Sequence, residues 1–214
     1  FSDQVSELGI SNDDKIIIYD VNGGYSAAAR VWWMFRVFGH ENVCLLNGGF
    51  SNWVANGYVT ETGFENIQKG KYTAELNNQL VSSFQDIMMN LKSGTSQIVD
   101  ARSKGRFFGT ESEPRPNIES GHIPNSLNLP VSELFEGGET MLFKPFEKLK
   151  RTIEDADIQM GKPIITTCGS GVTAAALCFA FYLLGHETSS VYDGSWSEWG
   201  VHKDTPKIKF EEKN

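Results

Sequence analysis

The feature that most constrains the fold is an internal repeat, in which residues 162–199 resemble residues 16–53 along their whole length without a gap. Both copies contain the tripeptide Gly-His-Glu at the same point. Identical residues spread over so long a stretch indicate that one supersecondary unit occurs twice in the chain. Other aligned pairs are Gly23 with Gly169, Ala28 with Ala174, Gly48 with Gly194, and Trp53 with Trp199.

Each copy predicts the same order of elements. The short apolar runs at 16–19 and 164–167 are typical of buried parallel strands. The stretches 26–38 and 172–184 are long enough for helices, are apolar nearly all round, and are each followed by a glycine that suits a helix end. Strand, tight loop, helix and strand together predict an α/β fold with parallel sheets flanked by helices.

The two copies differ in what precedes them. Before the second copy, the sequence predicts helices at 84–91 and 146–156, a strand at 97–100 and a loop at 114–130. Before the first copy there is room only for one short helix, at 3–8. We therefore predict a complete domain over residues 80–214, the incomplete back half of an equivalent domain over residues 1–60, and a polar linker over residues 61–79.

Composition narrows the function classes. The chain has 19 basic and 27 acidic residues, a net charge of −8, which argues against a nucleic-acid partner. No apolar run is long enough to cross a bilayer, so we expect no membrane partner. The cysteines Cys44, Cys168 and Cys178 form neither a disulfide framework nor a zinc-ligand spacing, so we expect free thiols and no metal.

Cys168 is the residue best placed for chemistry. It directly follows a predicted buried strand and opens a glycine-containing loop, residues 168–173, that leads into a helix. Glycines at 169 and 171 let backbone N–H groups turn inward, and N–H donors at a helix N-terminus stabilise an anion. Such surroundings lower the pKa of a thiol and make it a nucleophile. Cys44 and Cys178, in contrast, are interpreted as structural.

Three segments resemble the rhodanese superfamily of sulfurtransferases: CGSGVTA at 168–174, GHIPNSLNLP at 121–130 and YDGSWSEW at 192–199. More narrowly, they resemble the two-domain thiosulfate and 3-mercaptopyruvate sulfurtransferases. Residues 30–53 resemble the back half of that family's inactive first domain, which has no catalytic cysteine. Asn22 stands at the equivalent position here. The resemblance implies tandem rhodanese-like domains, the first of them incomplete.

The resemblance also implies a reaction. The Cys168 thiolate would take sulfur from a donor, hold it as a persulfide, and pass it to cyanide or to a thiol such as glutathione or a thioredoxin-like protein. No cofactor is implied, and family members occur in the cytoplasm and in mitochondria. The loop has Gly169 and Ser170 where thiosulfate-type enzymes carry basic residues, which favours 3-mercaptopyruvate as the donor. Thiosulfate stays the alternative donor.

The family's site residues fall on particular positions of this sequence. Ser170 matches a serine that joins His and Asp in a triad-like relay, whose partners lie in the front half of the family's first domain. Arg106 and Arg115 match the family's substrate arginines, and a guanidinium can bind a carboxylate through two hydrogen bonds. Further substrate contacts are implied for Gly169, Gly171, Val172 and Thr173.

Several other polar and aromatic residues are interpreted as scaffold. Asp100 and Arg102 match a structural pair of the family, and His122 lies in a scaffold motif. His40 and His186 recur in both copies, only one of which has a catalytic cysteine. The aromatic residues Trp32, Trp33 and Trp199 are expected in the core, whereas Trp196 is expected partly along the active cleft.

Two other kinds of protein use a similar cysteine loop. A protein phosphatase also places cysteine in a loop before a helix, but it needs an arginine six residues later, where this chain has Ala174. A rhodanese-like persulfide carrier or binding module without enzymatic turnover would need the same loop. Saturable turnover with small thiols would distinguish the enzyme from the carrier.

Overall fold

The computed structural model describes residues 1–21, 23, 25–63, 66–138 and 140–210. Its helices are α1 (Ser2–Glu7), α2 (Ala27–Val37), α3 (Gly49–Ala55), α4 (Phe84–Ser93), α5 (Lys104–Phe108), α6 (Phe146–Asp155), α7 (Ala174–Leu183) and α8 (Ser195–Trp199), with 3₁₀ turns η1 (Asn78–Leu80) and η2 (Val131–Leu134). Its strands are β1 (Ile16–Ile18), β2 (Val43–Leu45), β3 (Val81–Ser82), β4 (Gln97–Asp100), β5 (Leu127–Asn128), β6 (Ile164–Thr167) and β7 (Ser190–Tyr192).

The strands form two sheets, and every pair within them is parallel. The first copy of the repeat contributes the two-stranded sheet β1-β2, and the second sheet has the order β3-β7-β6-β4-β5. Parallel neighbours need a crossover, which helices such as α2 and α7 supply. The predicted α/β class with parallel sheets flanked by helices is therefore confirmed.

The long elements of the repeat lie where the sequence predicts them. The strand predicted at 164–167 is β6, and the predicted strand at 16–19 is β1, one residue shorter. The helices predicted at 26–38 and 172–184 are α2 and α7, within two residues at each end. Gly39 and Gly185 follow them with φ of 83° and 87°, a conformation that favours glycine.

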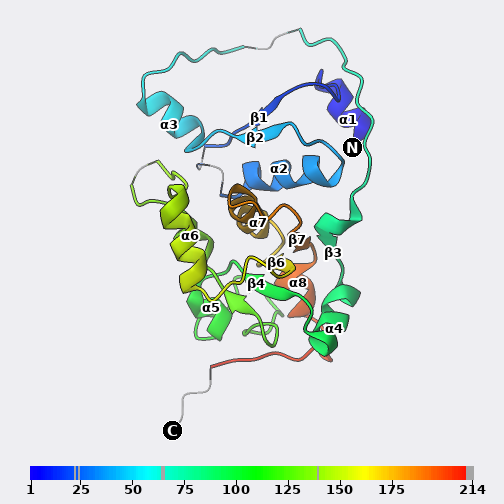
Figure 1. Ribbon diagram of the computed structural model, residues 1–214, viewed down its shortest axis with the longest axis vertical. Helices are drawn as coiled ribbons and strands as arrows, with labels where there is room; N and C mark the ends of the chain where they lie inside the picture. The colour runs from blue at the N-terminus through cyan, green and yellow to red at the C-terminus, as the bar shows by residue number, and fades with distance from the viewer. Residues whose placement is uncertain (22, 24, 64–65, 139, 211–214) are drawn as a thin grey trace.

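The two copies are packed together through α2 and α7, which lie between the two sheets (Figure 1). The Trp32 ring meets the edge of Phe179 at 5.0 Å between centroids and also contacts Tyr182 at 5.2 Å. Both copies contribute to one continuous core, in which α7 is buried along most of its length. The predicted core positions of Trp32 and Trp33 are confirmed.

The five-stranded sheet has an apolar layer on each face, because alternate residues of a strand point to opposite sides. On β6, Ile164 belongs to the core shared with α6 and α7, whereas Ile165 belongs to a second core beside α4 and α8. Trp196 and Trp199 of α8 are almost completely buried in that second core. Trp196 is thus a core residue and not a partly exposed wall of a cleft.

The predicted linker contains no helix or strand between Gly57 and η1 among the described residues. Its second half is hydrogen-bonded to the part of the chain that contains α1 and α2. Gly70 donates its N–H to the Ser6 carbonyl at 2.8 Å, and Asn77 donates to the Val37 carbonyl at 2.7 Å. The linker is therefore fastened to α1 and α2. The domain limits themselves stay a prediction.

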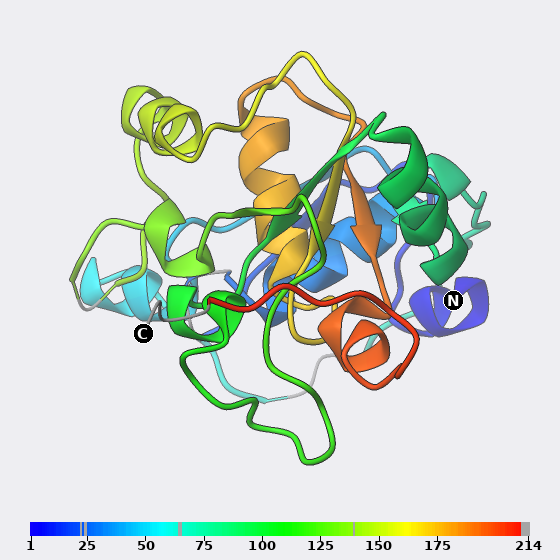
Figure 2. The ribbon, with the colours of Figure 1, turned by 90° about the horizontal axis from the view of Figure 1, so that it is seen from below.

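One face of the two-stranded sheet packs on α2, and the other carries Ile17 and Tyr19, which are 57% and 58% exposed. At the opposite end of the molecule, the segment after α8 returns to α5, where Ile208 and His122 exchange backbone hydrogen bonds (Figure 2). No helix among the described residues is both long and apolar enough to span a membrane.

Candidate active site

The loop that opens with Cys168 connects β6 to the N-terminus of α7. The Cys168 side chain is 2% exposed, and the Ser170 N–H donates to its Sγ at 3.4 Å. Gly171 has a φ of 77°, a left-handed conformation that turns the chain back toward the helix. Thr173 precedes α7 and makes no side-chain cap hydrogen bond, while Ala175 and Ala176 donate their N–H groups to the carbonyls of Val172 and Thr173.

The loop is held from behind by the start of α8. Trp196 donates its backbone N–H to the Cys168 carbonyl at 2.9 Å, and Ser197 donates to the Gly169 carbonyl at 3.0 Å. The Ser195 hydroxyl accepts a hydrogen bond from the Cys168 N–H at 3.2 Å. Because the carbonyls of Cys168 and Gly169 are hydrogen-bonded to α8, the loop backbone is held in one conformation, and this fixes the position of the Cys168 sulfur.

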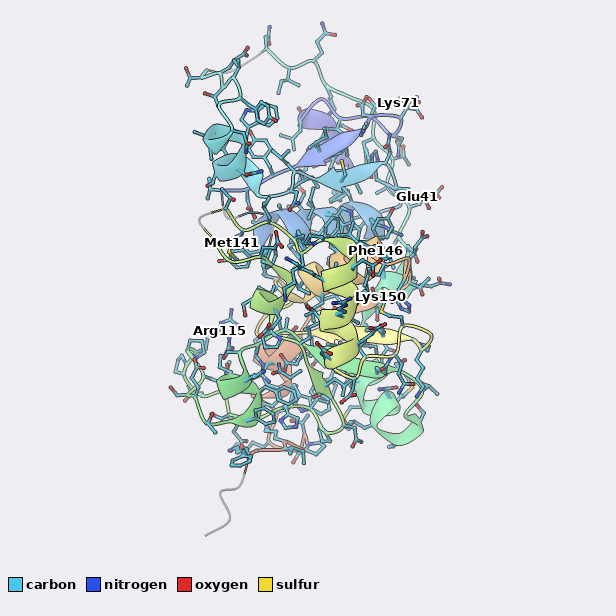
Figure 3. The ribbon with its side chains drawn as sticks, turned by 60° about the vertical axis from the view of Figure 1, so that its left-hand side comes forward. Glu41, Lys71, Arg115, Met141, Phe146 and Lys150 are labelled. Atoms are coloured by element: carbon cyan, nitrogen blue, oxygen red, sulfur yellow. The ribbon has the colours of Figure 1, made fainter. Side chains whose placement is uncertain are left out.

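The two arginines predicted to hold a substrate carboxylate both lie beside this loop. Arg115 donates from Nη1 to the Gly169 carbonyl at 3.2 Å, from the segment after α5 (Figure 3). The Arg106 guanidinium lies against Gly169, where an added Cβ would come within 3.0 Å of Nη2. The same Arg106 Nη2 is paired with Glu113 Oε2 at 2.6 Å, so the carboxylate of Glu113 orients it.

Behind Arg106 lies a buried ion network. Arg102 is paired with Asp100 at 2.6 Å and with Glu113 at 2.8 Å, and all three side chains are at most 3% exposed. Its guanidinium also stacks over the Trp196 ring at 4.3 Å. Asp100 and Arg102 are thus buried and paired with each other, as expected for a structural pair.

The histidines that the sequence analysis assigns to the scaffold are engaged in structural contacts. His122 stacks on Phe107 at 3.8 Å and donates from Nδ1 to the Phe107 carbonyl at 2.8 Å. Burial lowers the pKa of His122. His40 donates to the Asp14 carbonyl and His186 to the Met160 carbonyl, each at 3.0 Å.

The other two cysteines differ from Cys168 in their surroundings. Cys178 lies within α7, where burial raises its thiol pKa to about 11, and it contacts the Thr166 hydroxyl. Cys44 lies in β2 with its Sγ 3.6 Å from the Ile16 carbonyl. The Asn22 counterpart of Cys168 lies outside the described residues.

A residue that the sequence analysis missed also reaches the loop. Arg30 belongs to α2, in the first copy, and its Nη1 lies 2.6 Å from Asp193 Oδ1 and 3.4 Å from the Gly171 carbonyl. Nothing in the local pattern around Arg30 indicates this contact. It depends on the packing of α2 against α7, which only the three-dimensional structure gives.

The phosphatase alternative finds no support at this loop. Ala174, at the position where that chemistry needs an arginine, is completely buried as the first residue of α7. Among the described residues, no group of three or more His, Cys, Asp or Glu side chains is arranged to hold a metal ion.

Comparison with known proteins agrees with this geometry. The family model of the rhodanese-like domain matches residues 1–56 and 83–202. A mitochondrial thiosulfate/3-mercaptopyruvate sulfurtransferase of Arabidopsis thaliana is 41% identical over 96% of this chain and 59% of its own length. The 3-mercaptopyruvate sulfurtransferase of Mus musculus is 42% identical over 93% of this chain and 67% of its own length.

A solved structure shares the fold as well. The crystal structure of SseA from Escherichia coli, described as a 3-mercaptopyruvate sulfotransferase, superposes with a TM-score of 0.78 at 37% identity. The alignment covers 92% of this chain and 72% of that one. The chain spans about three-fifths to two-thirds of the length of the two curated relatives named above. With a cysteine loop held between α7 and α8 and sequence identity along nearly all its length, the chain belongs to the rhodanese family.

Proposed function

We propose that this chain is a sulfurtransferase that moves sulfur from 3-mercaptopyruvate to a thiol or cyanide through a persulfide on Cys168. The proposal rests on one contact. At the start of the loop before α7, the Ser170 N–H donates to the Sγ of Cys168 at 3.4 Å. A thiolate is stabilised by N–H donors at a helix N-terminus, and so is the negative charge of a persulfide.

The reaction has two steps. The Cys168 thiolate attacks the sulfur of 3-mercaptopyruvate, a new S–S bond forms, and the C–S bond breaks. The leaving enolate of pyruvate takes a proton, and the outer sulfur stays on the enzyme as a persulfide. An acceptor thiolate or cyanide then attacks that outer sulfur and releases the Cys168 thiolate, which gives ping-pong kinetics.

The residues around the loop fit a monocarboxylate donor. Arg106 and Arg115 supply guanidinium groups beside Gly169, and each can bind the donor carboxylate through two hydrogen bonds. Ser170, Gly171, Val172 and Thr173 complete the loop in the proposed roles of substrate polarisation and substrate contact. A dianionic donor would favour further cations in the loop itself, where the chain has Gly169 and Ser170.

Thiosulfate is the second donor candidate, because the name of the Arabidopsis relative includes both donors. With thiosulfate, Cys168 would attack the outer sulfur and sulfite would leave. We further propose glutathione or a thioredoxin-like protein as the acceptor and the cytoplasm or mitochondria as the location, the latter in keeping with the mitochondrial Arabidopsis relative.

The test compares sulfur transfer from 3-mercaptopyruvate and from thiosulfate in parallel. We expect faster turnover with 3-mercaptopyruvate and complete loss in Cys168→Ser, because serine cannot hold a persulfide. Cys44→Ser is the matched control and keeps the activity. Faster turnover with thiosulfate would contradict the donor assignment. A single added sulfur on Cys168 by mass spectrometry, without turnover, would indicate a persulfide carrier instead of an enzyme.

A further inference from the structure

The contact between Arg30 and the Cys168 loop joins the two copies of the repeat at the proposed site. Arg30 lies on α2 and is paired at 2.6 Å with Asp193, which lies two residues before the start of α8. Its Cζ lies 4.3 Å over the Trp33 ring, so an aromatic face also supports the guanidinium. The Arg30 side chain is only 24% exposed. The side chain is therefore held in place and is not a solvated surface group.

The second contact of Arg30 is with the loop backbone, where its Nη1 lies 3.4 Å from the Gly171 carbonyl. A Cβ added to Gly171 would lie 3.1 Å from that nitrogen and 2.9 Å from the Asp193 carbonyl, so the space is closed. The C=O and the following N–H of a trans peptide point in opposite directions. A Gly171 carbonyl turned toward Arg30 therefore turns the Val172 N–H away from α2.

We propose that Arg30 is a positioning residue for the proposed nucleophile: by holding the Gly171 carbonyl and Asp193, it keeps the loop in the conformation in which the Ser170 N–H donates to the Cys168 sulfur. The inference rests on the proposed role of Cys168. In the repeat alignment the counterpart of Arg30 is Ala176, which has no side-chain polar group. The positioning contact therefore runs in one direction, from the first copy to the loop of the second.

The other charged groups that face the loop are Arg106 and Arg115 on the side of Gly169, and Asp193 on the side of Gly171. The charge of Arg30 is balanced by Asp193, with which it is directly paired. Replacing Arg30 leaves the two substrate arginines unchanged. A change in the alkylation of Cys168 in an Arg30 variant then reports a change in the conformation of the loop.

The first measurement is the pH dependence of Cys168 alkylation in Arg30→Met and in the wild-type chain, followed by the mass of the peptide that contains Cys168. We expect Cys168 to be alkylated about tenfold more slowly in the variant near neutral pH, because its thiolate is no longer held against the Ser170 N–H donor. Turnover with the sulfur donor should fall about tenfold with little change in KM, because Arg30 is not one of the residues proposed to contact the donor.

Arg36→Met is the matched control. Arg36 lies on the same helix, and its guanidinium stacks at 4.4 Å on the ring of Tyr182 in α7. An equal slowing of Cys168 alkylation in Arg36→Met would show that any loosening of the α2–α7 contact has this effect, and would overturn the proposal. An unchanged alkylation rate of Cys168 in Arg30→Met would overturn it as well. If Arg30→Met does not fold, Arg30→Gln repeats the test.

Asp193→Ala separates positioning from simple charge. Loss of a nearby carboxylate speeds the alkylation of Cys168 if charge alone acts, whereas loss of the Arg30 anchor slows it if positioning acts. Faster alkylation of Cys168 in Asp193→Ala would therefore contradict the inference. A wild-type chain that transfers no sulfur from either donor would overturn the proposed function, while the alkylation comparison would still decide the role of Arg30.

Discussion

Arg102 is a charged residue that the protein encloses almost completely. It compensates the carboxylates of both Asp100 and Glu113, and it also donates to the Gly121 carbonyl at 2.8 Å. A buried ion pair adds little stability over an apolar pair of the same size, but removing one partner leaves an uncompensated charge. The network therefore stabilises the fold only while each of its charges is paired. Glu113, which belongs to the network, also pairs with Arg106 and holds it in place.

Replacing Arg102 should be strongly destabilising. We expect Arg102→Met to lower the free energy of unfolding by about 3–5 kcal/mol, measured by urea denaturation. Lys148→Met is the control, since its 2.8 Å pair with Glu136 is largely exposed and worth less than about 1 kcal/mol. Similar losses in the two variants would contradict the assigned importance of the buried network.

His122 should make stability depend on pH. Burial lowers its pKa in the folded state from 6.5, so as the pH falls the unfolded chain takes up the proton first. The unfolding free energy is then full above pH 6.5 and decreases as the pH falls below it. We expect this decrease to be smaller in His122→Gln, by urea denaturation at several pH values. The exposed His202 is the control, and an equal effect of His202→Gln would contradict the assignment.

Among the elements, α4 shows how strongly local signals can define a helix. Ser83 accepts from the Asp86 N–H at 3.3 Å, and the Ser83 N–H donates to Asp86 Oδ2 at 2.8 Å, which forms a capping box. The hydrogen bonds that the Asp86 carboxylate accepts from the Ser83 N–H and hydroxyl lower the pKa of Asp86. Gly94 ends the helix with a φ of 63°.

Removal of that cap is expected to cost about 1 kcal/mol of unfolding free energy in Ser83→Ala. The measurement is urea denaturation near neutral pH, where Asp86 is ionised. Ser93→Ala, at the other end of the same helix and in an exposed position, should leave the stability nearly unchanged. If Ser83→Ala lowers the unfolding free energy as little as Ser93→Ala does, this account of the helix start is wrong.

Elements with a strong apolar pattern were predictable from the sequence, whereas several very short elements without such a pattern were not. The helix α7 and the strand β6 follow from apolar runs of characteristic length. The helices α5 and α8 and the strands β3 and β5 have two to five residues, too few for any periodicity to appear. The Cys168 loop was predictable from its glycines, whereas Arg30 was not, because its partner Gly171 is far away in sequence.

On the scale of the whole molecule, the shared core makes the two copies of the repeat interdependent. Trp32 of α2 packs on Phe179 and Tyr182 of α7, and the same cluster extends to Val5 at the N-terminal end. Neither α2 nor α7 can leave this contact without exposing large apolar side chains to water. The division into two domains that the repeat suggests is therefore not a division into two independent cores.

The chain should accordingly unfold in a single transition. We expect the calorimetric and van't Hoff enthalpies to agree. Trp32→Ala should lower the unfolding free energy by about 3–5 kcal/mol and shift the whole transition. Two separate thermal transitions, or a Trp32→Ala effect confined to one of them, would show that the copies fold independently.

The packing of α2 on α7 also determines whether the two fragments would stay together after the chain is cleaved by a protease. The described residues between Gly57 and η1 form no helix or strand, and Val59 is 81% exposed, so a protease would cut there first. The two fragments would stay associated, because each covers an apolar face of the other. Two such pieces made separately would reassemble by fragment complementation, and a working site would need both, since Arg30 lies on one and Cys168 on the other.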